Sequence, residues 1–283
     1  MHKKRDRSQI KPNDNIYIYY IEGVIKSSST QLSNSSHFLG NWVEQESSFL
    51  FFSQPSDESV EAILFNNKHA KLIDKYEMTY EEWHGDKIKP YTLCNLVISP
   101  PWEEPEINRD NLKHIILDPG VVFGTGKHTT TEDCLTILHN LLKKEKVFSV
   151  MDIGSGTGLL SVGAAMLGAG NVLACDFNFL AAKTTLHNVC LNSLEDKIVV
   201  AQAKGEEFIN ISVDILIANI HYDVMKKIIE QKGFLNKKWF ILSGLLRTQT
   251  RKILKRLACK PVTILDHRCP DGIWNTILGK IDK

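Results

Sequence analysis

Several patterns that would indicate particular classes of protein are missing from this 283-residue sequence. No apolar run approaches the about 20 consecutive residues that a transmembrane helix needs, so no membrane association is predicted. Lys and Arg number 34 against 33 Asp and Glu, a net charge of +1. Such a balance gives no overall attraction to polyanions, and direct nucleic-acid binding is not expected. The basic start lacks the long apolar region of a secretory signal, so we interpret residues 1–15 as a disordered tail.

Cysteine is scarce and scattered. The six cysteines are Cys94, Cys134, Cys175, Cys190, Cys259 and Cys269. No two of them are close enough for a C-x-x-C metal or redox motif, and several fall inside apolar runs. Buried, reduced thiols of a cytoplasmic protein are therefore predicted, and no metal site.

The first hundred residues and the remainder of the chain differ in pattern. Apolar and aromatic residues alternate over 16–21, and residues 57–65 have helical spacing, which predicts a small α+β domain at 16–99. Pro100, Pro101 and Pro105 interrupt any regular element, so a linker is predicted at 100–110. Residues 111–283 then form a second domain.

The second domain alternates short β-branched runs with helical stretches. The strand-like runs are residues 147–153, 171–175, 197–201, 213–218 and 239–242. This alternation predicts βαβ units and a parallel sheet. At the end, only residues 268–271 join runs 261–267 and 272–280, too few for a crossover helix, so an antiparallel hairpin is predicted. We therefore expect an α/β fold, the Rossmann-like sheet of class I methyltransferases with a terminal antiparallel hairpin.

A glycine-rich loop follows the first strand of this domain. Gly154, Gly156 and Gly158 stand where the next helix begins, and glycines there let backbone N–H groups approach a ligand closely. Asp176 ends the following strand, where it can accept hydrogen bonds from ribose hydroxyls. A dinucleotide-binding loop would have its third glycine at Leu159, so the spacing favours S-adenosylmethionine over a nicotinamide dinucleotide. A merely structural turn and a solvated Asp176 are the alternatives.

Upstream of the first strand, residues 118–131 are rich in glycine and hydroxyl side chains and suggest a lid over the cofactor. Thr129-x-x-Glu132 fits a capping box, so Thr129 is predicted to cap the next helix. Thr131 fits a cofactor contact better. His128 is interpreted as a hydrogen-bonded loop residue, with a role as ligand or base as the alternative.

Four segments resemble, in their order and spacing, the ribosomal protein L11 methyltransferase family. They are residues 118–131, residues 152–158, Ala218-Asn219-Ile220 and Leu242-Ser243-Gly244. The similarity covers about residues 80–280. It implies a cytoplasmic enzyme that uses S-adenosylmethionine to methylate lysine side chains, and the N-terminal amine, of one large-subunit ribosomal protein. The resemblance implies cofactor contacts at Thr131, Gly154, Asp176 and Asn219, and the glycine loop adds Gly156.

The first 80 residues match the family little, although this region recognises the ribosomal substrate in the family. The target could therefore be another protein. A protein that binds adenosylmethionine without catalysis is a second alternative. A nicotinamide oxidoreductase is disfavoured by Leu159 and by the terminal hairpin.

The expected reaction is a direct displacement by an amine, which needs positioning rather than a metal. Asn219, at the end of the fourth strand, is the candidate catalytic residue because its side-chain carbonyl can orient an amine. Its alternative role is to cap the helix that follows His221. His221 and Asp223 are conceivable proton acceptors, and neither is assigned as a base. Glu206 and Glu207 follow the third strand. They are interpreted either as contacts of the adenine amino group or as a solvated helix start.

Overall fold

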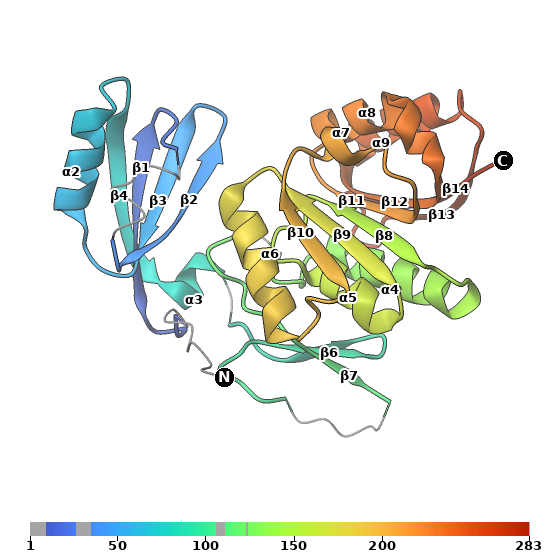
Figure 1. Ribbon diagram of the computed structural model, residues 1–283, viewed down its shortest axis with the longest axis horizontal. Helices are drawn as coiled ribbons and strands as arrows, with labels where there is room; N and C mark the ends of the chain where they lie inside the picture. Colours follow the sequence, from blue (N-terminus) through green and yellow to red (C-terminus); the bar gives the residue numbers. More distant parts are fainter. Residues whose placement is uncertain (1–9, 27–34, 86, 106–110, 123, 283) are drawn as a thin grey trace.

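The structure is a computed structural model that describes residues 10–26, 35–85, 87–105, 111–122 and 124–282. Two bodies lie side by side, a small one from the first part of the chain and a large one from the rest (Figure 1). Residues 1–9 of the predicted tail lie outside the described residues, and β1 begins at the end of that predicted tail.

The small body is a four-stranded antiparallel sheet covered on one face by a helix. Its elements are β1 (Asn15–Glu22), β2 (Phe38–Glu44), β3 (Ser47–Phe52), α2 (Asp57–Asn66), β4 (Lys71–Thr79) and the short α3 (Tyr80–Trp83), with strand order β2-β3-β1-β4. Side chains alternate along β1, so Tyr19 and Ile21 pack with α2 while Ile16 and Ile18 face the large body. The predicted small α+β unit is confirmed.

The large body is built on a seven-stranded sheet. Its strands are β8 (Ser149–Ile153), β9 (Asn171–Asp176), β10 (Ile198–Gln202), β11 (Val213–Asn219), β12 (Lys237–Leu246), β13 (Val262–Arg268) and β14 (Trp274–Ile281), in the order β10-β9-β8-β11-β12-β14-β13. The first five are parallel, and β14 runs antiparallel to both β12 and β13. The predicted parallel sheet and terminal hairpin are confirmed.

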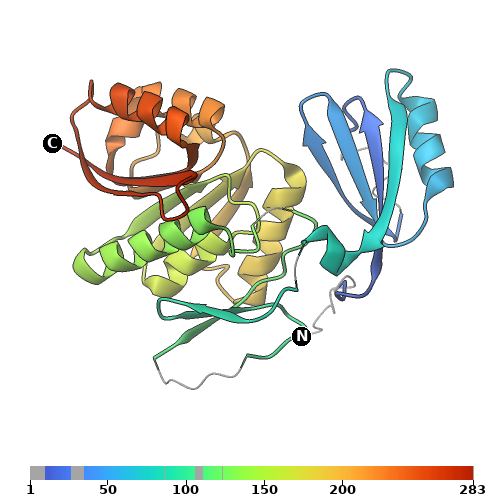
Figure 2. The ribbon, with the colours of Figure 1, turned by 180° about the vertical axis from the view of Figure 1, so that it is seen from behind.

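Helices cover both faces of this sheet (Figure 2). On one face lie α4 (Thr129–Lys144), α5 (Leu159–Leu167) and α6 (Phe179–Leu191), and on the other lie α7 (Gly205–Phe208), α8 (Tyr222–Glu230), the 3-10 helix η1 (Lys232–Asn236) and α9 (Arg247–Leu257). Neighbouring residues of one strand enter different cores: Val150 packs with the first layer and Met151 with the second. Burial on both faces is why these strands are almost continuously apolar in sequence.

A third, three-stranded sheet bears on where the domains divide. It contains β5 (Tyr91–Leu93), β6 (Leu96–Ser99) and β7 (Lys113–Ile116), and β6 pairs in parallel with β7 across the predicted linker. Leu96, Ile98 and Ile115 belong to the same core cluster as α4 and α5. We therefore propose that the domain boundary falls between α3 and β5, rather than at 100–110. The prolines end a strand, but the chain on either side of them packs into one domain.

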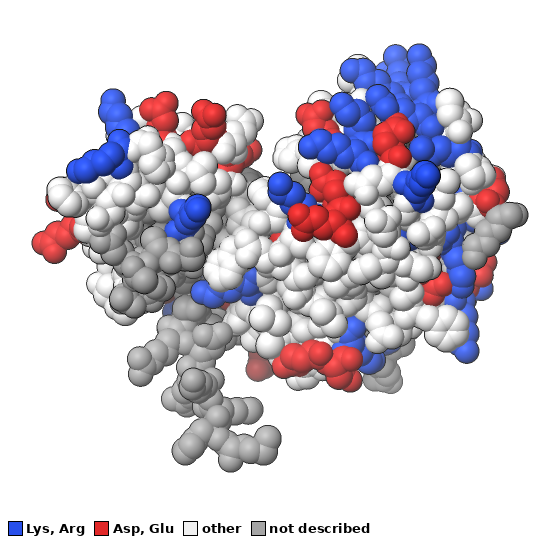
Figure 3. Space-filling model, turned by 45° about the horizontal axis from the view of Figure 1, so that its top comes forward, with Lys and Arg blue, Asp and Glu red and all other residues white. Residues whose placement is uncertain are grey.

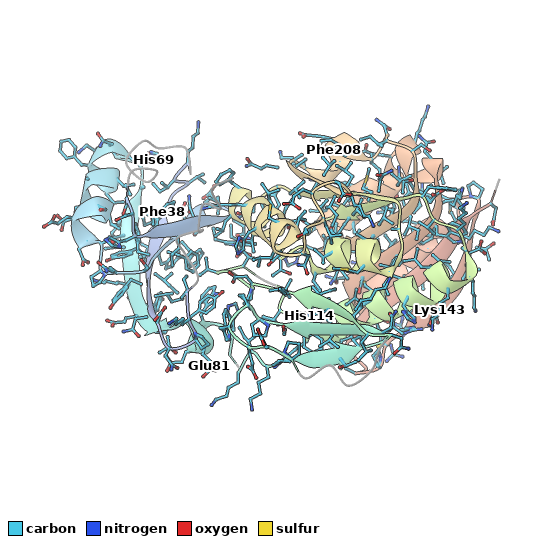
Figure 4. All side chains as sticks on the ribbon, turned by 60° about the horizontal axis from the view of Figure 1, so that its bottom comes forward. Phe38, His69, Glu81, His114, Lys143 and Phe208 are labelled. Atoms are coloured by element: carbon cyan, nitrogen blue, oxygen red, sulfur yellow. The ribbon has the colours of Figure 1, made fainter. Side chains whose placement is uncertain are left out.

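The two domains meet through one face of the small sheet. Ile16 and Ile18 pack in one cluster with Val121 and Leu180, which begin the lid region and α6. Figure 4 shows Phe38 on β2 of the small domain and His114 on β7 of the large one. The small domain thus contacts the start of the lid, which extends from there toward the site.

The burial predicted for the cysteines is wrong for three of them. Cys134 and Cys175 are buried, but Cys94, Cys190 and Cys259 are exposed. Cys190 lies on the outer face of α6, where an apolar run in sequence does not imply burial of every member. In the described part of the chain, no helix is both long and apolar enough to cross a membrane, and no cluster of three His, Cys, Asp or Glu side chains suits a metal ion.

Candidate functional site

The candidate site lies at the carboxyl ends of β8, β9 and β11. β8 pairs with β9 on one side and with β11 on the other. The chain adds β9 and β10 on one side of β8 and then crosses to add β11 and β12 on the other, so the strand order reverses at β8. Open α/β sheets bind ligands at such a switch point, outside the carboxyl ends of the strands. The glycine loop, Asp176 and Asn219 each follow or end one of these three strands and are brought to this edge.

The glycine loop takes conformations that only glycine adopts readily. The φ angles are +76° at Gly154, +56° at Gly156 and +83° at Gly158. The Gly154 N–H donates to the Cys175 carbonyl at 2.8 Å, which fixes the loop against β9. A side chain at Gly154 would collide with Ile220, so the loop also lies close to the turn after β11.

The loop ends at the helix predicted from the sequence. α5 begins at Leu159, and its N-cap, Gly158, provides no side-chain hydrogen bond. The first N–H groups of a helix have no partner within it and favour negative or electron-rich ligand atoms. The turn therefore offers backbone donors to a ligand at the switch point.

Asp176 is buried beside this loop, with 6% of its surface exposed. One carboxylate oxygen accepts the Gly156 N–H at 3.1 Å, and the other accepts the Asn178 N–H at 2.9 Å. Burial raises the pKa of Asp176, and the two backbone donors act against that shift. Each oxygen keeps a second lone pair, so the carboxylate can accept from two hydroxyls, as the predicted ribose contact requires.

Asp152, the last polar residue of β8, begins the motif 152–158 around which the cofactor pocket was predicted, but no contact of its own was assigned to it. One carboxylate oxygen accepts from Ser161 Oγ at 2.6 Å, and the other has no partner in the described part of the chain. Burial raises its pKa to about 6. An orphaned, fully buried carboxylate is costly unless a cation compensates it. Its position at the start of the glycine loop was the sequence signal that could have identified it.

A buried asparagine of α6 joins the lid to the glycine loop. Asn188 donates through Nδ2 to the carbonyls of Asp118 and Thr157, at 2.8 Å each, and accepts the Asp118 N–H through Oδ1 at 2.8 Å. Thr157 Oγ1 in turn donates to the Gly124 carbonyl at 2.7 Å. The lid is therefore held against the glycine loop at two points. Asn188 was missed because its partners lie far away in sequence.

The start of α4 differs from the prediction at Thr129. The N-cap is His128, whose Nδ1 accepts the Thr130 N–H, so the predicted Thr129 cap is wrong. Thr129 is the first helical residue, and its hydroxyl donates instead to Asp271 Oδ2 at 2.8 Å. The His128 ring packs edge-on against Trp274, with 5.4 Å between centroids. The terminal hairpin thus contacts the lid helix.

Asn219 and Thr131 come together as the predicted site requires. Asn219 Nδ2 donates to Thr130 Oγ1 at 3.2 Å and to Thr131 Oγ1 at 3.5 Å. α8 has its N-cap at His221, so Asn219 is not a helix cap. In the described structure no residue donates to Asn219 Oδ1, which lies beside Gly244. That carbonyl oxygen is left to accept from an amine.

The remaining candidates lie at the margin. Glu206 acts electrostatically on Cys175, the neighbour of Asp176, whereas Glu207 is exposed. His221 and Asp223 are also exposed, and neither is shown bonded to Asn219. Of these four, Glu206 is the one whose charge acts on the end of β9.

These residues fit the predicted cofactor. S-adenosylmethionine carries ribose hydroxyls, an amino group and a sulfonium cation, and the edge offers a buried Asp176 and an orphaned Asp152 oxygen. A side chain at Gly154 or Gly158 would collide with Ile220 or Thr185, so the loop between the two carboxylates requires glycine at these positions. A cationic cofactor matches two buried carboxylates better than an anionic dinucleotide does.

Comparisons with known proteins identify relatives of this chain. A family model described as "Ribosomal protein L11 methyltransferase (PrmA)" matches residues 31–282. The ribosomal protein L11 methyltransferase of Carboxydothermus hydrogenoformans is 33% identical over 209 residues, which cover 72% of this chain and 68% of the relative. That of Halalkalibacterium halodurans is 35% identical over 187 residues, covering 64% of this chain and 59% of the relative.

A solved structure is also similar. The ribosomal protein L11 methylase of Lactobacillus delbrueckii subsp. bulgaricus superimposes with a TM-score of 0.62 at 26% sequence identity. The match covers 69% of this chain and all of that chain.

Proposed function

Since the chain belongs to the ribosomal protein L11 methyltransferase family, we propose that it transfers methyl groups from S-adenosylmethionine to amines of ribosomal protein L11. The acceptors are lysine side chains and the N-terminal amine. The observation that carries the proposal is the meeting of Asn219 with Thr130 and Thr131, which places a free carbonyl oxygen beside the cofactor edge. With a ribosomal substrate, we expect the enzyme to act in the cytoplasm.

The residues divide the binding of the cofactor among them. Asp176 holds the ribose hydroxyls, and the orphaned oxygen of Asp152 compensates a positive group. Gly154 and Gly156 allow the backbone to approach, and Thr131 closes the site from the lid side. When bound, S-adenosylmethionine supplies an activated methyl group.

The acceptor amine must be neutral and aligned. A lysine has a free pKa of about 10.4 and must lose a proton before it attacks. A desolvated pocket lowers that pKa. Asn219 Oδ1 accepts a hydrogen bond from the amine and directs its lone pair toward the methyl group, which contributes chiefly orientation.

The test is transfer of labelled methyl from S-adenosylmethionine to a cytoplasmic extract that lacks this enzyme, with Asp176→Ala protein in parallel. One small ribosomal protein labelled only by the intact enzyme is the expected result. A different labelled protein would keep the chemistry and reassign the target. Cofactor binding without any labelled product would overturn the enzymatic proposal.

A further inference from the structure

The charge of the molecule is unevenly distributed. Residues 221–260 contain 11 of the 34 Lys and Arg but only two of the 33 Asp and Glu, which leaves 23 basic and 31 acidic residues elsewhere. Figure 3 shows Lys and Arg gathered over the region of α8 and α9. The expectation of no nucleic-acid partner rested on the net charge of +1. That value averages a basic segment, residues 221–260, with an acidic remainder of the chain.

The basic side chains form one continuous surface, which we name the basic face. It consists of Lys226 of α8 and Arg247, Arg251, Lys252, Lys255 and Arg256 of α9. The buried residues of α9 are Thr250, Ile253 and Leu257, so its opposite side faces solvent. From Arg247 to Arg256 the helix rises about 14 Å, enough for several phosphates of a nucleic-acid strand.

This arrangement opposes the stability of α9. Arg247, Arg251 and Lys255 are spaced four residues apart, and so are Lys252 and Arg256, which places like charges beside one another. Arg247 also stands at the positive end of the helix dipole. A face that is charged only for solubility would carry both signs.

Few carboxylates neutralise the basic face. Glu230 pairs with Arg256 at 2.6 Å. Within the described residues, no carboxylate lies within 4.0 Å of the charged groups of Arg247, Arg251, Lys252 or Lys255. These four charges are available to a partner.

An aromatic ring lies where the basic face meets the candidate site. Tyr222 is half-buried, and the Nζ atoms of Lys226 and Lys252 lie 5.9 Å and 5.8 Å from its ring centroid. It begins α8, three residues after Asn219 at the end of β11, so this end of the basic face lies close to the candidate site. Aromatic rings beside basic groups are how proteins bind exposed bases together with their phosphates.

From these observations we infer that the basic face binds RNA, and that an acceptor protein which is itself RNA-bound is held there by its RNA while its amine enters the site. A lysine-rich acceptor segment would be repelled by this surface. A membrane is disfavoured because the apolar side of α9 is buried in the core. The choice of RNA among polyanions rests on the proposed ribosomal substrate.

The test is binding of a labelled RNA hairpin with a single-stranded loop to the full chain, measured by fluorescence anisotropy over a range of KCl. The variant is Arg251→Glu/Lys255→Glu. Its matched control is Lys143→Glu/Lys144→Glu, an equal charge change at the exposed end of α4, where Figure 4 labels Lys143. Circular dichroism checks that each variant is folded.

We expect the wild type to bind with an affinity that falls steeply with salt, and the variant on the basic face to bind at least about tenfold more weakly with a shallower salt slope. The control should bind like the wild type. Absence of salt-dependent RNA binding, equal weakening in both variants, or equally tight binding of poly-glutamate would overturn the inference, the last in favour of an acidic protein partner. RNA binding is read without methyl transfer, so Asp176→Ala should bind RNA normally even if the proposed function fails.

Discussion

The two halves of the seven-stranded sheet use their polar residues in different ways. In the half formed by β8, β9 and β10, the polar groups of the site are buried and bonded to the backbone, as at Asp176 and Asn188. In the half formed by β11 to β14, the basic face leaves four charged side chains exposed and without a carboxylate partner among the described residues, those of Arg247, Arg251, Lys252 and Lys255. A small cofactor is matched by a buried site whose polar groups are bonded to the protein except for one oxygen of Asp152, whereas a macromolecular partner is met by a solvated surface.

The most severe test of this comparison is Asp176→Ala. It removes the acceptor for the proposed ribose hydroxyls and leaves the Gly156 and Asn178 N–H groups without their partner. We expect cofactor affinity to fall about 100-fold, the size of a lost charged hydrogen-bond pair, when S-adenosylhomocysteine binding is measured by calorimetry.

The matched control is Asp214→Ala at the opposite edge of the same sheet. Asp214 likewise accepts two backbone N–H groups, those of Phe148 and Ser149, at 2.7 and 3.1 Å. This variant should lose stability but keep cofactor affinity. If both variants lost affinity equally, Asp176 would be only a structural carboxylate.

Asp152→Asn tests the comparison within the half of the sheet formed by β8, β9 and β10. The ordinary pKa of 3.8 is raised to about 6 by burial, so the folded state binds more protons than the unfolded state between those values. Stability of the ligand-free protein therefore falls as pH rises through this window, by up to about 3 kcal/mol, and stays lower above it. The Asn variant lacks this loss.

Urea unfolding near pH 4 and at pH 8 tests this. The variant should be more stable than the wild type at pH 8, the gap should narrow near pH 4, and the variant should bind the cationic cofactor about tenfold more weakly. If the two proteins had the same pH dependence, the Asp152 carboxylate would already be stabilised in the ligand-free protein, and its burial would not raise its pKa.

Asn219→Ala tests the boundary between the halves. Asn219 ends β11 and contacts the lid, but its proposed role concerns the acceptor amine. We expect kcat to fall about 30-fold, on the order of 2 kcal/mol of lost orientation, with little change in the affinity for S-adenosylhomocysteine. A loss of cofactor affinity as large as that of Asp176→Ala would show that Asn219 chiefly binds the cofactor rather than the acceptor amine.

The elements of the large domain could be predicted because local patterns determine them. The β-branched runs, the glycine loop and the short turn before β14 each follow from residues close in sequence. Thr129 was predicted as a cap by the same local reasoning, which failed because Asp271, 142 residues away, captures its hydroxyl. The Asn188 contacts span 31 and 70 residues and left no periodic signal. The pairing of β6 with β7 was also missed, because it joins segments on either side of the prolines and left no local signal.

The smallest expected effect concerns the contact of the terminal hairpin with the lid helix. Asp271→Ala removes the acceptor of the Thr129 hydroxyl, next to the threonines that meet Asn219. The N–H groups of Ile273 and Trp274 lower the pKa of Asp271, so it is ionised at neutral pH and the contact persists there. We expect kcat to fall about threefold with unchanged stability, as for one exposed hydrogen bond that positions a neighbour. Asp282→Ala is the control, because Asp282 accepts from Thr263 at 3.0 Å at the other end of the same hairpin. Equal rates in the two variants would mean that the terminal hairpin packs against α4 without positioning the threonines that meet Asn219.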